Sequence, residues 1–278
     1  MCAIIGGVIA WKALAPSEKS ADAAVSAEER EKKKEQDEKE IADGPPVKFT
    51  PGYPEWYAYN YAFPEPIGKL GEAANYDMED PRWSGWFRDH EGREIGLTSR
   101  RITINALHEG TTIIQGMRVA DLQCTDTAMN GTLVIPKPIG DGGDDVQRTV
   151  IGFDLSEPSP RPRVVEGYPE KGQETNVKFG GAAFTETVTL DKGDARTFEI
   201  YFVSPTRDCT FGLEVNVTSA DRDEWIPVDF GDGKKEYLAG RAEKYQSLVR
   251  PTLDYSGQEV GDVKDAYTPP VTVTKRSG

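Results

Sequence analysis

The central part of the chain alternates apolar and polar residues with a period of two. In the stretch TFGLEVNVT, residues 210–218, one face holds Phe211, Leu213, Val215 and Val217, and the other holds small or polar residues. This alternation is typical of a β-strand that buries one face. Eight segments of this type, separated by turn residues, lie at 100–106, 111–122, 131–136, 149–155, 184–190, 196–203, 210–218 and 224–230.

No long helical pattern lies between these segments, which argues against a parallel sheet built from strand–helix–strand units. We therefore predict an all-β fold: an antiparallel β-sandwich that is immunoglobulin-like in shape. Membership of the immunoglobulin family is not expected, because no tryptophan lies between Trp86 and Trp225 and position 207 is arginine instead of the tyrosine of that family.

Two local patterns predict how the strands connect and end. The loop SPTRD, 204–208, predicts a hairpin between the strands on either side of it. Residues 234–249 then carry apolar side chains at helical spacing, namely Leu238, Ala242, Tyr245 and Val249. We expect a short C-terminal helix here, docked on the sandwich, with Asp232 as a candidate N-cap and Gly240 weakening the pattern.

The most apolar stretch of the chain is CAIIGGVIAWKALAP, residues 2–16. It is shorter than the roughly 20 residues of a spanning helix, and Lys12 interrupts it. A cleaved signal peptide fits poorly, since no basic residue comes first and Pro16 follows the ALA site. We interpret the stretch as the end of an uncleaved membrane anchor whose beginning precedes this sequence. A complete short anchor or signal, and an apolar helix of a soluble protein, are the alternatives.

A charged segment follows, with 12 charged residues among the 13 of EEREKKKEQDEKE. Glutamates precede lysines by four residues but no apolar stripe accompanies them, which predicts a solvated helix or flexible spacer. The predicted organisation is an anchor at 1–16, a spacer at 17–44, an aromatic-rich arm packing on the sandwich at 45–94, the sandwich with its C-terminal helix at 95–254 and a disordered tail at 255–278. It resembles in outline single-pass bacterial proteins that carry an extracytoplasmic β domain.

The net charge limits the kinds of partner that the protein can bind, and the cysteines bear on its cellular compartment. The formal net charge of −14 repels nucleic-acid phosphates, so no nucleic-acid partner is expected. Cys2 lies in the apolar stretch, which leaves Cys124 and Cys209 as the pair that the body could form. Each lies beside a predicted strand, and outside the cytoplasm we expect them to form a disulfide.

Aromatic residues form the most specific local signal, in FTPGYPEWYAYNYAF (49–63) and DPRWSGWF (80–87). Such rings combine a large contact area with a low entropy cost. The candidate ligand platform consists of Trp56, Tyr57, Tyr59, Tyr61, Trp83 and Trp86. The alternative is that these rings clasp the sandwich and cap its core.

Motifs for chemistry are sparse. The loop GDGGDD offers Asp141, Asp144 and Asp145 as oxygen ligands for Ca²⁺, with a plain solvated turn as the alternative. His90 and His108 are the two histidines, without zinc-site spacing, and we expect them in solvated turns. No nucleophile, phosphate-loop or redox motif is found in the sequence, so no other cofactor is expected.

These patterns predict a non-catalytic binding or interaction module that is tethered to the cell membrane through one N-terminal helix, with the bulk of the chain outside the cytoplasm. Its expected partner is an extracytoplasmic protein or a cell-wall glycan. Two alternatives remain: a hydrolase of cell-envelope polymer that uses a carboxylate pair, and a structural subunit of an envelope or secretion complex.

Overall fold

The computed structural model describes residues 30, 32, 44–52, 60–76, 80–136, 148–167, 176–220, 222–230, 233–251, 258–261 and 272–275. The chain divides into two compact units, Met1–Pro45 and Pro46–Gly278. In the first unit Arg30 and Lys32 are helical, and the predicted anchor lies outside the described residues. Within the described ranges we find no helix with the length and apolarity needed to cross a membrane.

The regular secondary structure among the described residues of the second unit is mostly β-strand, with few helices, so the predicted all-β fold is confirmed. Its elements are β1 (Val47–Gly52), β2 (Tyr61–Phe63), η1 (Gly71–Asn75), α2 (Pro81–Asp89), β3 (Arg93–Glu94), β4 (Gly96–Ala106), β5 (Thr112–Asp126), β6 (Thr132–Val134), β7 (Thr149–Asp154), β8 (Arg163–Gly167), β9 (Asn176–Ala183), β10 (Val188–Leu190), β11 (Ala195–Ser204), β12 (Arg207–Ser219), β13 (Arg222–Pro227), β14 (Glu236–Leu238), β15 (Ser247–Pro251), β16 (Gln258–Gly261) and β17 (Thr272–Lys275).

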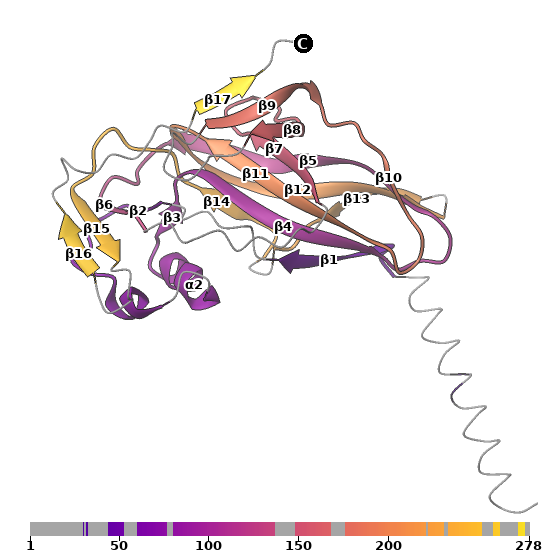
Figure 1. Ribbon diagram of the computed structural model, residues 1–278, viewed down its shortest axis with the longest axis horizontal. Coiled ribbons are helices and arrows are strands. Elements are labelled where there is room, and N and C mark those ends of the chain that lie inside the picture. The colour runs from indigo at the N-terminus through magenta and orange to yellow at the C-terminus, as the bar shows by residue number, and fades with distance from the viewer. Residues whose placement is uncertain are drawn as a thin grey trace, which may run out of the picture. The chain divides into compact units, whose positions relative to one another are not determined.

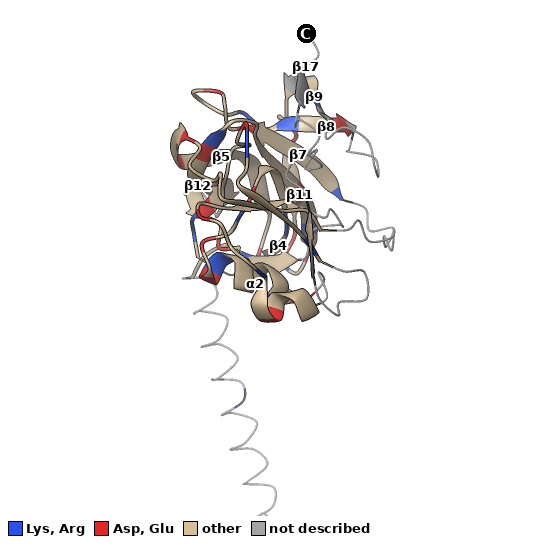
Figure 2. Ribbon diagram, turned by 90° about the vertical axis from the view of Figure 1, so that its left-hand side faces the viewer, with Lys and Arg blue, Asp and Glu red and all other residues tan. Residues whose placement is uncertain are grey.

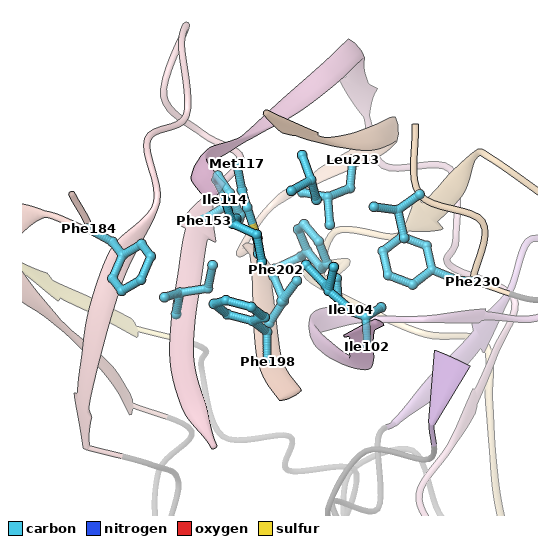
Figure 3. Packing of buried hydrophobic residues seen from close by; sticks show 14 of the residues in the cluster. Ile102, Ile104, Ile114, Met117, Phe153, Phe184, Phe198, Phe202, Leu213 and Phe230 are labelled. Atoms are coloured by element: carbon cyan, nitrogen blue, oxygen red, sulfur yellow. The ribbon is translucent and has the colours of Figure 1, made fainter. Parts of the chain in front are cut away.

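Two sheets face each other across the main hydrophobic core. One has the order β1-β4-β11-β7-β8-β9-β17, and the other has the order β10-β5-β12-β13, with β14 also paired to β12. Views at right angles show β5 and β12 lying over β4 and β11 (Figure 1, Figure 2). Alternate residues of both sheets point into the gap, among them Ile102, Phe198 and Phe202 from one sheet and Leu213 from the other (Figure 3).

A third sheet, β16-β15-β6-β2-β3, lies at one end of the two long sheets and next to α2 (Figure 1). It has its own core, in which Phe63 of β2, Val134 of β6 and Val249 of β15 pack on Phe87 of α2. The helix begins where Asp80 accepts a hydrogen bond from the Arg82 amide (2.9 Å) and proline occupies the first turn.

All eight predicted segments contain strands, and the predicted buried faces of the segments at 196–203 and 210–218 lie in the main core. The expectation of purely antiparallel sheets is wrong. Three described strand pairs, β11 with β7, β15 with β6 and β17 with β9, run parallel. The absence of helices between strands does not prevent parallel pairing here, because the parallel partners lie far apart in the sequence with other strands between them.

The predicted hairpin at 204–208 is also wrong. β11 pairs with β4 and β7, whereas β12 pairs with β5, β13 and β14. The loop therefore crosses from one sheet to the other. The rings of Phe202 and Phe211 meet across the core with centroids 4.6 Å apart, because both strands direct their apolar faces toward each other.

The predicted C-terminal helix is absent from the described residues of 234–249, which instead contain β14, an extended stretch and the start of β15. Gly240 explains why. Its amide donates to the Asp208 carboxylate (2.8 Å), and a Cβ at this position would lie 2.3 Å from the amide nitrogen of Arg207. The chain passes too close to the start of β12 for a helix or for any other residue.

The predicted disulfide is confirmed. Cys124 of β5 and Cys209 of β12 are directly opposite in the strand register, and their sulfurs are bonded. In the range predicted as a disordered tail, 258–261 and 272–275 instead form strands β16 and β17, paired with β15 and β9.

Candidate functional site

The structure places the candidate aromatic residues in different environments. Tyr61 and Trp83 are 6% and 3% exposed, and they stack on and abut Phe87 with ring centroids 4.0 and 4.8 Å away. A sugar cannot stack on rings that the protein already covers, so the exposed platform is wrong at these two residues. Trp86 is half-buried and lies parallel to the His90 ring at 4.2 Å. Trp56, Tyr57 and Tyr59 lie outside the described residues.

The other sequence candidates are not assembled into a site. Asp141, Asp144 and Asp145 lie outside the described residues, and within the described part no cluster of three acidic, histidine or cysteine side chains suits a metal ion. His90 is exposed, as expected for a turn histidine. His108 is only 6% exposed, and its Nδ1 lies 3.3 Å from the Ser219 hydroxyl, so the solvated-turn expectation is wrong for it.

A pocket of about 190 Å³ lies where α2, β2, β3, β4 and β14 meet. Its ionisable lining residues are Arg88, Arg93, Glu94, Arg100, Lys235 and Glu236. Tyr61, Ser84, Gly92 and Tyr237 complete the lining. Four cations and two carboxylates therefore line one concavity of a strongly acidic chain, and both signs of charge appear on the ribbon around α2 and β4 (Figure 2).

Backbone pairing fixes the walls of the pocket. β2 and β3 are antiparallel, with Tyr61 opposite Glu94. β3 continues toward β14, where the Ala239 amide donates to the Glu94 carbonyl (2.9 Å). Between α2 and β3 the chain turns at Gly92, where an added Cβ would lie 2.9 Å from the rings of Phe63 and Phe87. Only glycine lets the turn approach this core closely.

The Arg100 guanidinium forms the base of the pocket by bridging its two carboxylates. Nη2 and Nε donate to Glu236 Oε2 (2.8 and 3.2 Å), and Nη1 donates to Glu94 Oε2 (3.1 Å). The side chains are 22% exposed for Arg100, 12% for Glu94 and 9% for Glu236. Because charges shielded from water interact strongly, this ion triad is held more firmly than a surface pair.

Hydroxyl groups complete the coordination of Glu94. The Thr98 hydroxyl donates to Glu94 Oε2 and accepts from Arg100 Nη1 (2.6 Å). The Tyr61 hydroxyl donates to Glu94 Oε1 (3.4 Å). The buried ring of Tyr61 thus belongs to the core of the third sheet, while its hydroxyl reaches the pocket. The base of the pocket is preorganised, because each member has partners within the protein.

The rim of the pocket is basic. Arg88 projects from the last turn of α2, and Lys235 precedes β14; both residues are exposed. Arg93 lies over the Tyr237 ring, with its guanidinium carbon 5.2 Å from the ring centroid. Its Nη1 donates to the backbone carbonyls of Arg88 (3.2 Å) and Gly92 (2.9 Å). In the described part of the chain, neither Arg93 nor Lys235 forms an ion pair.

A buried carboxylate, Asp208, lies beside Tyr237. Asp208 accepts hydrogen bonds from the amides of Ala128 (2.9 Å) and Gly240 (2.8 Å), and its negative charge lies near the Tyr237 hydroxyl. Burial, followed by the negative charge of Asp208, raises the pKa of the Tyr237 hydroxyl, while the positive charge of Arg93 opposes the shift. The raised pKa keeps the Tyr237 hydroxyl neutral at neutral pH, and the Tyr237 ring lies under the Arg93 guanidinium.

A second buried acid lies outside the pocket. Glu199 of β11 is 1% exposed and accepts from Arg101 Nε (3.1 Å) and the Ser99 hydroxyl (3.2 Å). Burial raises its pKa despite the opposing charge of Arg101. Glu199 does not line the described pocket and has no second carboxylate among its hydrogen-bond partners here, so it supports no catalytic assignment.

Sequence reasoning found Tyr61 but missed the rest of this pocket. Its residues come from five elements that span positions 61 to 237. The local signal that existed was the basic pair KK at 234–235 directly before an alternating EYL segment.

Comparison of the chain with protein-family models, with curated proteins and with solved structures finds no match.

Proposed function

We propose that this protein is a membrane-tethered, extracytoplasmic binding module whose ligand site is the pocket between α2, β2, β3, β4 and β14. The N-terminal apolar stretch serves as the single tether, and the strand-rich unit is displayed outside the cytoplasm. We further interpret the two facing sheets as a β-sandwich of immunoglobulin-like shape, with the third sheet and α2 attached at one end.

The cysteine pair supports the compartment. Cys124 and Cys209 lie on neighbouring strands in direct register and form a disulfide. Disulfides persist in oxidising compartments and are rare in the cytosol. The bond joins β5 to β12, and β12 also pairs with β14, which supplies Glu236 and Tyr237 to the pocket. A disulfide-bonded framework thus supports the ligand site.

The observation that carries the binding function is the preorganised base of the pocket. Arg100, Glu94 and Glu236 are fixed by one another and by neighbouring hydroxyls. Small ligands usually bind in concave sites, where a few precisely placed polar groups fix their orientation. Its volume of about 190 Å³ suits a small ligand or one group of a larger one.

One observation favours a hydrolase as the second candidate, since Glu94 and Glu236 place two carboxylates in one concavity. A glycosidase needs its two carboxyl groups to flank the scissile bond with room for substrate between them. Here Arg100 donates to both carboxylates and so occupies the space between them. The arrangement therefore favours binding over hydrolysis.

The test is a ligand screen with the full chain in non-ionic detergent, read by thermal shift and by chemical analysis of recovered ligand. Ser84→Trp places a large ring at the pocket from the exposed face of α2, and Asp89→Trp adds the same ring on the same helix away from the pocket lining. We expect hits that stabilise the wild type and Asp89→Trp, fail with Ser84→Trp and are recovered unchanged. Ligands that bind Ser84→Trp as well as the wild type would contradict the site. Accumulation of a ligand's hydrolysis product would favour the hydrolase.

A further inference from the structure

We infer that the pocket binds an oxyanion, either a carboxylate or a phosphate group, and that Arg93 and Lys235 hold it. This inference rests on the proposed function, because it names the class of ligand for the same pocket. The acidic composition of the chain argues against anionic partners in general. The pocket is a local exception to that overall charge.

The charge balance of the pocket points to an anion. Four basic and two acidic residues line it. Both acids are engaged by Arg100, so this triad neutralises one cation and leaves one excess negative charge at the base. The two rim cations Arg93 and Lys235 outweigh that charge. A ligand that enters from solvent meets the positive rim before it meets the occupied carboxylates.

The rim also has hydrogen-bond donors to offer. Among the described residues, Arg93 uses Nη1 for its hydrogen bonds, to two backbone carbonyls. Its Nε and Nη2 form no hydrogen bond there, and neither does the ammonium group of Lys235. Guanidinium groups match the two oxygens of a carboxylate or phosphate, and ammonium groups add a point charge. The Tyr237 ring under Arg93 limits the positions that the guanidinium can take.

The size of the pocket restricts the ligand. Its volume of about 190 Å³ is below the roughly 300–1,000 Å³ of sites for drug-sized molecules. A free phosphate or small carboxylate fits, and so does one anionic group of a polymer that continues outside the pocket. Both sources present the same oxyanion to the same rim.

The experiment is calorimetric titration of the full chain in non-ionic detergent at low ionic strength. The probes are inorganic phosphate, citrate, oligoglutamate and polyphosphate as oxyanions, N-acetylglucosamine as a neutral sugar and spermidine as a cation. Lys235→Ala removes a rim cation, and Lys234→Ala is its matched control, because both lysines are exposed but only Lys235 lines the pocket. Thermal unfolding of both variants verifies the fold.

We expect at least one oxyanion to bind saturably, with a Kd that rises about tenfold in Lys235→Ala and stays within about twofold in Lys234→Ala. Binding of the free anions would identify a small-molecule source, and binding of the polymers alone would identify a polymer-borne group. If a neutral or cationic probe binds, Ser84→Trp abolishes that binding and no oxyanion binds, the oxyanion inference is overturned and the proposed function stands. If no probe shows binding that Ser84→Trp abolishes, both the oxyanion inference and the proposed function are overturned. If Lys234→Ala and Lys235→Ala weaken oxyanion binding equally, the binding reflects general surface charge and the inference is overturned.

Discussion

Substitution of Arg100 by methionine removes the cation that links the two carboxylates of the pocket while keeping an unbranched side chain in place of the aliphatic stem of arginine. Glu94 and Glu236 are 12% and 9% exposed and would then face each other without a positive partner. Loss of one partner from a buried ion pair costs about 3–5 kcal/mol. Because Arg100 itself is 22% exposed, we expect the lower end, about 3 kcal/mol of unfolding free energy.

The assay is urea unfolding of the full chain, followed by tryptophan fluorescence. Arg118→Met is the matched control, since Arg118 also pairs with a glutamate, Glu214, at 2.7 Å but is 51% exposed. We expect this control to cost about 1 kcal/mol or less. Adding Glu94→Gln and Glu236→Gln to Arg100→Met should restore about 1–2 kcal/mol, because no uncompensated charge remains. An Arg100→Met loss no larger than that of Arg118→Met would refute the view that the triad is a shielded, preorganised base.

Three further outcomes follow from contacts outside the triad. Replacement of Cys124 and Cys209 by alanine opens a loop with a sequence separation of 85, which should cost about 4.5 kcal/mol of stability on chain entropy alone. Urea midpoints with and without reductant measure the loss, and a loss under about 1 kcal/mol would count against the disulfide as a framework. Gly240→Ala, whose Cβ would lie 2.3 Å from backbone atoms, should lower stability by about 2 kcal/mol or more in thermal unfolding, whereas Gly68→Ala, with no atom within 4 Å, should be neutral. The pKa of Glu199 is raised in the folded state, so ionisation of Glu199 destabilises the folded protein. The stability of Glu199→Gln relative to wild type should therefore rise with pH from about 4.5 up to the raised pKa and then level off. A stability difference that does not depend on pH would disprove the shift.

The strands of the main core could be predicted because each carries its own signal. Phe198, Ile200 and Phe202 alternate, and so do Phe211, Leu213 and Val215, and all six lie in the main core. Alternation identifies the buried face of a strand, but it does not identify the neighbouring strand. For this reason the sequence pattern predicted β11 and β12 correctly and their pairing wrongly.

The failed helix has a similar cause. Leu238, Ala242 and Tyr245 have helical spacing, yet the chain here is extended: Leu238 is buried in the main core, whereas Ala242 and Tyr245 share a smaller hydrophobic cluster. Burial alone does not distinguish a short helix from an irregular buried segment. The deciding contact is between Gly240 and the start of β12, which is distant in the sequence and leaves no local pattern.

The pocket could not be predicted for the same reason of distance. Arg100 and Glu236 form an ion pair although they are 136 residues apart. The aromatic signal that drew attention to Tyr61 and Trp83 reflected the core of the third sheet, because large rings are the usual material of a compact core. Their burial directs the search for a ligand site to the charged surface beside them.

The most direct test of the pocket is a crystal structure of the full chain with the oxyanion that binds most tightly in the calorimetric series. We predict electron density for the anion inside the pocket, with its oxygens within hydrogen-bond distance of Arg93 and Lys235 and with the Arg100–Glu94–Glu236 triad unchanged. Density for the bound anion at another surface, with the pocket holding only solvent, would contradict the account.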